Sequence, residues 1–251
     1  MQNKNHEVKV YTTLNIGNFH TTHCEDFLID EEISTNERLI AVLDGCTMGK
    51  ESAFASILYS KILRKIAKNK FYSELVLKED ITAKRKLKSV LSELFQETKI
   101  VKNQLNLEIN ELLSTLIIGI VNISNGSAEF LTVGDGMIYA NGQTIDYEQD
   151  DKPDYLGYHL QDNFEDWYKA QQQTLSLTKF DDISICTDGI YTFKNFSNPN
   201  KQLTQEEIIQ FLLVDKTDSV YPNFLATKIS QLKNEMHHVV TDDLAIIRLF
   251  R

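Results

Sequence analysis

The sequence predicts an α+β fold with largely antiparallel sheets, and two observations carry this prediction. Short apolar runs typical of strands fall into groups, and these groups are separated by pairs of segments with helical spacing. The resulting order is strands, two helices, strands, two helices and a final strand. Because α/β proteins alternate strands and helices one by one, this grouped order favours the α+β class.

The first strands and the first helix pair occupy the N-terminal part of the chain. Strands are expected at residues 8–14, 27–29 and 39–43, and the last of these is apolar throughout, as in a strand buried on both faces. Apolar residues then recur with helical spacing over 52–70 and again over 84–101. These stripes predict two amphipathic helices that pack on a sheet.

A second group of strands follows at 116–123, 128–133, 137–140 and 143–145. The Asn125-Gly126 and Asn141-Gly142 steps lie between such runs and favour tight turns, so the four strands are predicted to form an antiparallel meander. Residues 146–173 show no period and contain the chain's single tryptophan, which indicates a flap or variable loop.

The C-terminal part predicts two strands, two helices and a last strand. The strands are expected at 174–177 and 183–186, and the final one at 244–250. One helix begins at Thr204, where Glu207 completes a capping box. The other is expected from about Asp218 to Met236, with Pro222 in its first turn.

Composition favours one domain over residues 1–251. The chain is 42% hydrophobic, has three prolines and lacks a linker-like or repeated segment. A formal charge of −10 disfavours nucleic acid and anionic membrane as partners. We expect a cytoplasmic protein, because no secretory signal opens the chain and its three cysteines suit a reducing compartment. Composition does not predict the oligomeric state.

Acidic residues stand at the ends of several predicted strands. They are Glu25-Asp26, Asp44-Gly45, Asp135-Gly136, Asp188-Gly189 and Asp242-Asp243. Asp-Gly alone is a common turn signal, yet helix-like sequence follows Asp44-Gly45 and no matching strand follows Asp188-Gly189. Two carboxylates about 4 Å apart repel by roughly 4 kcal/mol at an effective dielectric near 20, so a cluster of them requires cations. All-oxygen ligands favour magnesium or manganese over zinc.

These motifs, in this order, resemble a divergent, bacterial-type member of the metal-dependent protein phosphatase 2C family. The matching segments are Cys24-Glu25-Asp26, Asp44-Gly45 with the helix after it, Ser114-Thr115, Val133-Gly134-Asp135-Gly136, Cys186-Thr187-Asp188-Gly189 and Thr241-Asp242-Asp243. The resemblance spans nearly the whole chain. It implies a four-layer α-β-β-α sandwich, with two largely antiparallel sheets flanked by helix pairs.

The resemblance also implies an activity and a set of site residues. The activity is hydrolysis of phosphoserine or phosphothreonine in proteins by a metal-activated water. Asp26, Asp44, Asp188 and Asp242 would be the catalytic residues that hold two magnesium or manganese ions, with the Gly45 carbonyl as a further ligand. Two more acids match secondary positions: Glu25 would assist through water, and Asp135 with Asp188 would hold a third ion.

One departure concerns the substrate phosphate. The family's phosphate-binding arginine corresponds to Thr21 in this sequence, and the basic residues that could substitute for it are His20, His23, Arg38 and Lys50. Thr21 therefore keeps an alternative open, a phosphatase-like binding or regulatory module with weak or no turnover. A phosphatase for a small metabolite is a third possibility.

Overall fold

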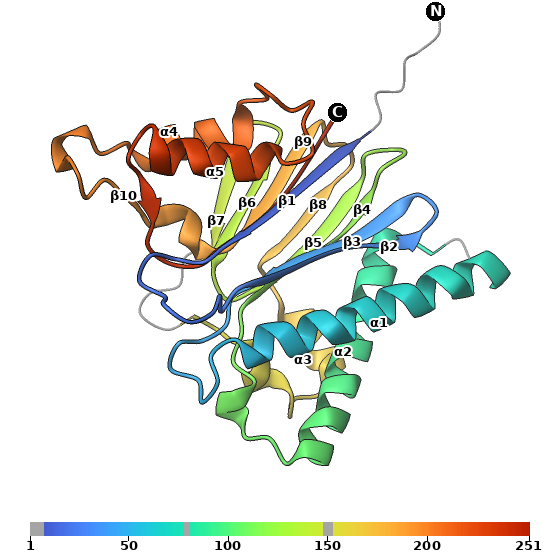
Figure 1. Ribbon diagram of the computed structural model, residues 1–251. Helices are drawn as coiled ribbons and strands as arrows, with labels where there is room; N and C mark the ends of the chain where they lie inside the picture. The colour runs from blue at the N-terminus through green and yellow to red at the C-terminus, as the bar shows by residue number, and fades with distance from the viewer. Residues whose placement is uncertain (1–7, 78–80, 148–152) are drawn as a thin grey trace, which may run out of the picture.

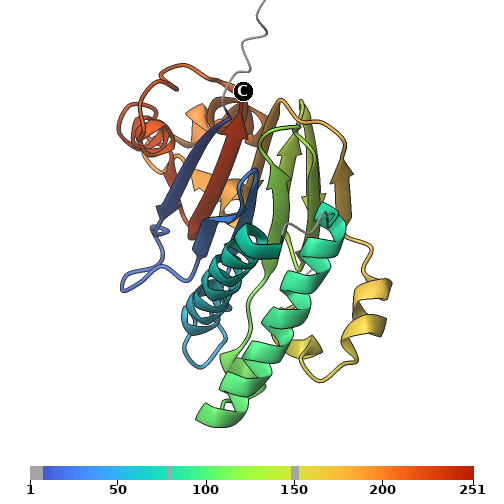
Figure 2. The same cartoon turned by 90° about the vertical axis from the view of Figure 1, so that its right-hand side faces the viewer.

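The computed structural model describes residues 8–77, 81–147 and 153–251. Two antiparallel sheets face each other, and helices cover the outer side of each (Figure 1; Figure 2 shows the same layers from the side). The predicted α+β, four-layer arrangement is confirmed.

Each main sheet has five strands. The first has the order β2-β3-β4-β5-β8, with bounds Phe27–Ser34, Glu37–Leu43, Leu116–Asn122, Ala128–Val133 and Thr174–Leu177. The second has the order β1-β12-β9-β6-β7, with bounds Lys9–Asn15, Leu244–Phe250, Asp182–Cys186, Gly136–Ala140 and Gln143–Tyr147. A short ribbon pairs β10 (Phe193–Lys194) with β11 (Val239–Val240).

Different helices cover the two sheets. Those beside the first sheet are α1 (Phe54–Leu77), α2 (Ala83–Leu105) and α3 (Phe164–Ala170). Those beside the second are α4 (Gln205–Ile209), the π-helical segment η5 (Gln210–Val214) and α5 (Phe224–Asn234). Short 3₁₀ turns are η1 (Ile109–Glu111), η2 (Leu156–His159), η3 (Asp188–Tyr191) and η4 (Pro199–Lys201).

Strand β3 shows why its sequence is apolar throughout. Leu39, Ala41 and Leu43 pack in the layer beneath α1 and α2. Ile40 and Val42 point the other way, into the layer between the two sheets. Side chains alternate across a strand, so a strand covered on both sides needs apolar residues at every position. Each fully buried aliphatic side chain contributes about 1.5–3 kcal/mol.

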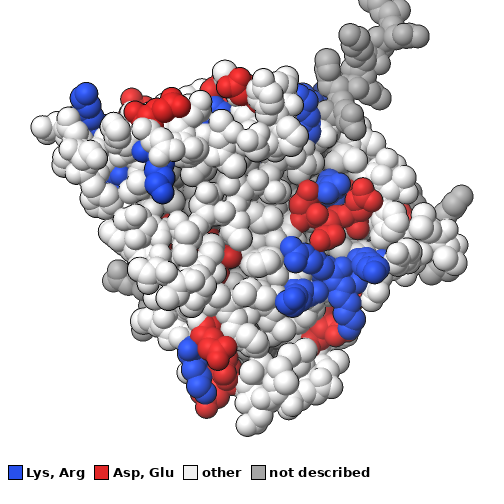
Figure 3. All heavy atoms as spheres, viewed as in Figure 1, with Lys and Arg blue, Asp and Glu red and all other residues white. Residues whose placement is uncertain are grey.

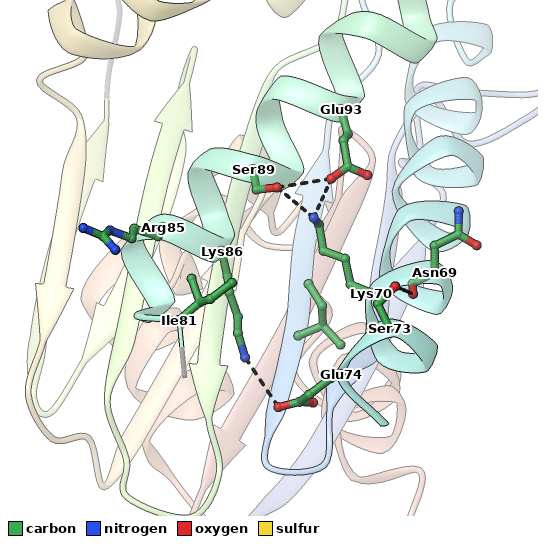
Figure 4. Close-up of a pocket in the computed structure, with 10 residues that line it drawn as sticks. Asn69, Lys70, Ser73, Glu74, Ile81, Arg85, Lys86, Ser89 and Glu93 are labelled. Atoms are coloured by element: carbon green, nitrogen blue, oxygen red, sulfur yellow. Dashed lines mark hydrogen bonds and ion pairs between the residues drawn. The ribbon is translucent and has the colours of Figure 1, made fainter. Parts of the chain in front are cut away.

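Helices α1 and α2 are joined by apolar contacts and by ion pairs. Lys70 of α1 donates to Ser89 Oγ at 2.8 Å and pairs with Glu93, both on α2. Lys86 of α2 pairs with Glu37 of β3 and lies 3.7 Å from Glu74 of α1. Figure 4 shows these side chains around a cavity of about 650 Å³. Both lysines are thus already paired with carboxylates of neighbouring elements.

The predicted meander is wrong at one connection. Strands β5 and β6 do not pair, because they belong to different sheets and the chain crosses between them at Asp135. Gly134 and Gly136 have φ angles of +90° and +125°, which residues with a Cβ rarely adopt, so this Asp-Gly step forms a corner between the sheets. The Asn141-Gly142 turn between β6 and β7 agrees with the prediction, with φ values of +50° and +90°.

The segment predicted as a flap contains packed elements where the structure describes it. Leu156, Leu160 and Trp167 are buried in the core beside α2, and the Trp167 ring centroid lies 4.6 Å from that of Phe95. Residues 148–152 lie outside the described residues.

The last helix begins later than predicted. Asp218 has a φ of +64°, a left-handed conformation that cannot continue a right-handed helix. Helix α5 therefore starts at Phe224, and Pro222 lies in the turn before it. The capping box at Thr204 and Glu207 is present as predicted.

Surface charge is unevenly distributed on the described part of the chain. Lys and Arg side chains gather over α1 (Figure 3), which exposes Lys61, Arg64, Lys65 and Lys68. Arg64 pairs with Glu31 at 3.3 Å, and Lys65 with Glu97 at 2.8 Å. Within the described ranges, no helix combines the length and the apolar character that a membrane span needs.

An ion pair between a buried lysine and a partly exposed aspartate anchors the π-helical segment. Lys228 of α5 is 3% exposed; its Nζ donates to Asp215 Oδ2 at 2.7 Å and lies 4.0 Å from the centroid of the Phe211 ring. Burial acts to raise the pKa of Asp215, but donation by Lys228 and Thr217 outweighs it and lowers the pKa to about 2. The carboxylate thus stays ionised beside a buried ammonium group.

We predict that Asp215→Asn lowers the free energy of unfolding at pH 7, because Lys228 loses its carboxylate partner. A group with a depressed folded pKa stabilises the protein above its unfolded pKa near 3.9, and this contribution is lost as pH falls toward 2. The difference between wild type and variant, measured by urea unfolding from pH 7 to pH 3, should therefore shrink below about pH 4. The exposed Asp181→Asn is the control, and a difference independent of pH would contradict the account.

Candidate metal centre

Four of the strand-end acids meet at one end of the sandwich. Asp26 precedes β2 and Asp44 follows β3, and these strands pair with Phe27 opposite Leu43. In the second sheet Asp188 comes shortly after β9 and Asp242 shortly before β12, which also pair antiparallel. Antiparallel pairing puts the end of one strand beside the start of its partner. Each sheet therefore contributes two acids.

The side chains of these acids interact with one another across the two sheets. Asp26 and Asp44 share a hydrogen bond, and the charge of Asp188 raises the pKa of both. Asp242 acts electrostatically on Asp44 and on Asp188. Asp135, from the corner between the sheets, acts on Asp188 and is itself affected by Asp242. The structure thus brings together five of the acids that the sequence singled out.

Burial and mutual repulsion hold protons on this cluster when no cation is bound. Burial has the largest effect on the pKa of Asp26 and raises it, as do the charges of Asp188 and Asp243. Hydrogen bonds to Thr187 and Asp44 lower the pKa but do not offset this rise, so the pKa is about 8. Burial and then the charges of Asp135 and Asp242 raise the pKa of Asp188 to about 7. The pKa of Asp44 is raised well above its ordinary value for the same reasons. A bound cation would relieve both the burial cost and the repulsion.

The donor set fits an oxygen-ligated divalent ion, although the side chains are not oriented around one. Within the described ranges, no three His, Cys, Asp or Glu side chains are arranged so that they could hold an ion as they stand. Carboxylates alone suit magnesium or manganese.

Two threonines fix the acids on their strands, and the predicted site did not include them. Thr187 Oγ1 donates to Asp26 Oδ2 at 2.6 Å and accepts from the Ala245 amide at 2.9 Å, so it links the first sheet to the second. Asp44 and Thr115 exchange two bonds, Asp44 N to Thr115 Oγ1 at 3.3 Å and Thr115 N to Asp44 O at 2.9 Å. Thr187 stands beside a motif acid, and Thr115 lies in the Ser114-Thr115 segment that carries the resemblance, but sequence analysis assigns neither residue a role.

Asp243 fastens the N-terminal loop to the acid cluster. It is 2% exposed; it accepts from Gly17 N at 2.6 Å and from Glu25 N, and His20 Nδ1 lies 2.8 Å from its Oδ2. A Cβ on Gly17 would lie 2.3 Å from the Asp242 carbonyl carbon, so the loop passes close to the acid pair. The sequence predicted Asp242 as a ligand but gave no role to its neighbour.

The secondary ligand positions also lie near the cluster. Glu25 is buried, and its Oε2 accepts from Thr47 Oγ1 at 2.9 Å. Gly45 donates its amide to Glu25 O at 3.2 Å, and a Cβ there would lie 2.2 Å from the Ser52 carbonyl oxygen. Only glycine fits at this position. Metal ligation by the Gly45 carbonyl, Glu25 or Asp135 stays a prediction.

Of the four basic residues considered for phosphate binding, His20 alone contacts an acid of the cluster. Its Nε2 lies 3.5 Å from Asp242 Oδ1. Arg38 pairs with Asp30 at 2.6 Å, near the end of β3 opposite to Asp44. Lys50 lies 4.0 Å from Glu111, and His23 bonds to Thr22 and Ser52, so these two side chains have other partners.

A family model described as protein phosphatase 2C matches residues 20–234. The chain belongs to the protein phosphatase 2C family. The match includes Asp26, Asp44, Asp135 and Asp188, whereas Asp242 lies beyond it. Membership makes the chain a hydrolase of the metal-dependent protein serine/threonine phosphatase class. No curated protein sequence matches it.

Solved structures share the fold of this protein phosphatase 2C chain at low sequence identity. A bacterial serine phosphatase is 15% identical, with a TM-score of 0.61 and 97% of each chain covered. RsbX in complex with magnesium is 16% identical, with a TM-score of 0.50, 99% of this chain covered and 96% of that one.

The phosphatase domain of SpoIIE from Bacillus subtilis, solved with a fragment of its regulatory domain, is 14% identical with a TM-score of 0.57. The alignment covers 97% of this chain but only 63% of the length of that structure.

The acid cluster predicts that Asp188→Asn stabilises the metal-free phosphatase. The substitution removes a charge that burial and the neighbouring Asp135 and Asp242 disfavour. At pH 8 with a chelator present, we expect the free energy of unfolding to rise by on the order of 1–2 kcal/mol. Thermal and urea unfolding measure this, with Asp181→Asn as the surface control. A destabilised Asp188→Asn variant would contradict the description of the cluster.

Proposed function

We propose that Asp26, Asp44, Asp188 and Asp242 of this phosphatase hold two divalent cations, magnesium or manganese, at which phosphoserine and phosphothreonine of protein substrates are hydrolysed. One observation supports the proposal: four acids from two sheets lie close together, and their charges disfavour ionisation within the cluster. Asp135, with Asp188, is proposed to hold a third ion. Glu25 and the Gly45 carbonyl are proposed as further oxygen ligands.

The bound ions would supply one part of the chemistry, a lowered pKa for the attacking water and neutralised charge on the phosphoryl oxygens. The chain supplies the rest. Thr187 holds Asp26 at one orientation, and Asp243 holds the loop that precedes it. Side chains held in this way would bind the cations at defined positions and so would orient the attacking water.

We assign to His20 the phosphate contact that the family's arginine, replaced here by Thr21, would make. Its ring lies beside Asp242, whose side chain is 47% exposed and therefore marks the open side of the cluster. A ring nitrogen there can donate a hydrogen bond to a phosphoryl oxygen. The open position supports a protein substrate over an enclosed metabolite, and the retained acids support turnover over binding alone.

Substitution of the acids tests the proposal directly. We expect Asp44→Asn to lower kcat/KM for a phosphopeptide by on the order of a hundredfold or more in the presence of manganese, because it removes a ligand of the cation pair. Asp181→Asn is the charge-matched control. Hydrolysis that survives a chelator, or an Asp44→Asn variant as active as the control, would overturn the proposal.

Thr187→Val tests the supporting role of the hydroxyl. The change keeps the side-chain shape but removes the donor to Asp26. The apparent manganese affinity should fall about tenfold, and excess manganese should restore turnover. A loss of turnover that manganese does not restore would show that Thr187 acts by another route.

A further inference from the structure

Two aromatic rings lie exposed against each other beside the candidate metal centre. Phe19 is 68% exposed and Phe196 is 58% exposed. Their ring centroids are 6.2 Å apart at an interplanar angle of 48°. They come from distant parts of the chain, and together they form what we call the Phe19–Phe196 patch.

The loop that carries Phe19 is fixed to the acid-bearing end of the second sheet. The Phe19 amide donates to Thr241 O at 3.0 Å, and the Asn18 amide donates to Val240 O at 2.9 Å. The next residue along the chain, His20, lies against Asp242. Phe19 is therefore held close to the backbone that presents Asp242.

The loop that carries Phe196 is fixed as well. Asn195 donates its amide to Gln202 Oε1 at 2.8 Å, and its own Oδ1 accepts from the Asn198 amide at 2.8 Å. The strand just before it, β10, pairs with β11, which leads into Asp242. Both rings thus project from backbone that is ordered in advance, which lowers the entropy cost of binding an apolar group on them.

The position of the patch indicates what it binds. A peptide whose phosphorylated residue lies at the acids would pass Phe19, since an extended chain advances about 3.3–3.6 Å per residue. Two rings are also far smaller than the roughly 800 Å² per partner that a stable protein interface buries, so the patch suits one side chain better than a second copy of this chain.

We propose that the Phe19–Phe196 patch binds an apolar side chain of the protein substrate, within about three residues of the phosphorylated serine or threonine. This inference rests on the proposed function, because it assigns the phosphate to the acid cluster. Binding of this side chain gives the phosphatase a preference for substrates with apolar residues near the phosphorylation site.

A set of phosphopeptides tests the preference. Each carries one leucine at a different position within three residues of phosphoserine, in an otherwise alanine- and serine-based sequence. We expect one leucine position to lower KM about five- to tenfold relative to the alanine peptide, with kcat unchanged. Phe19→Ala and Phe196→Ala should each remove most of this advantage. N-acetyl-phosphoserine amide, which has no neighbouring side chain, should be hydrolysed equally by all forms.

Tyr221→Ala is the matched control, because Tyr221 is also 58% exposed but lies in the turn before α5. Peptide binding by fluorescence anisotropy with manganese present separates the two proposals. If no peptide is hydrolysed, the proposed function fails, while tighter binding of a leucine peptide that depends on Phe19 still supports the patch. Equal KM and equal binding for leucine and alanine peptides would overturn the patch, as would a change in oligomeric state without a change in peptide preference.

Discussion

Repulsion among clustered carboxylates is the constraint on which this structure depends. Asp26 and Asp44 belong to one sheet and Asp188 and Asp242 to the other, so closing the sandwich forces like charges together. Apolar packing between the sheets, through side chains such as Ile117, supplies the free energy that holds them there. The phosphatase therefore holds at this end of the sandwich a group of carboxylates whose ionised forms are disfavoured, and a divalent cation would relieve this cost.

The contacts around the cluster join the two sheets as well as the acids. Thr187 links Asp26 of one sheet to the Ala245 amide of the other, and Asp243 ties the N-terminal loop to the last strand. These hydrogen bonds involve groups that are almost fully buried, so each is expensive to break. The same few residues thus support both the fold and the geometry of the proposed metal site.

The sequence places these acids at strand ends, as the structure does, because a strand end is a local feature. An apolar run followed by Asp-Gly can be recognised without knowing which distant residues it contacts, and this signal marks both Asp44 and Asp188. Sheet membership is not local, so the sequence predicts a continuous meander across Asp135 although β5 and β6 lie in different sheets. The packed turns at 156–170 escape sequence prediction because their buried residues, such as Trp167, are too few to show a period.

The supporting residues of the site are beyond sequence reasoning for a related reason. Asp242 and Asp243 are identical side chains in adjacent positions, and only the fold decides that Asp243 is buried as a hydrogen-bond acceptor while Asp242 stays half exposed. Likewise, the Phe19–Phe196 patch joins residues far apart in the chain. Pairings of this kind depend on tertiary contacts that no local pattern records.

The most direct test of the account is a crystal structure grown with manganese, with anomalous scattering used to locate the ions. We expect at least two anomalous peaks among Asp26, Asp44, Asp188 and Asp242, with the hydrogen bond between Asp26 and Asp44 replaced by bonds to metal. Saturating manganese with no peak among these carboxylates, or with peaks only elsewhere on the protein, would contradict it.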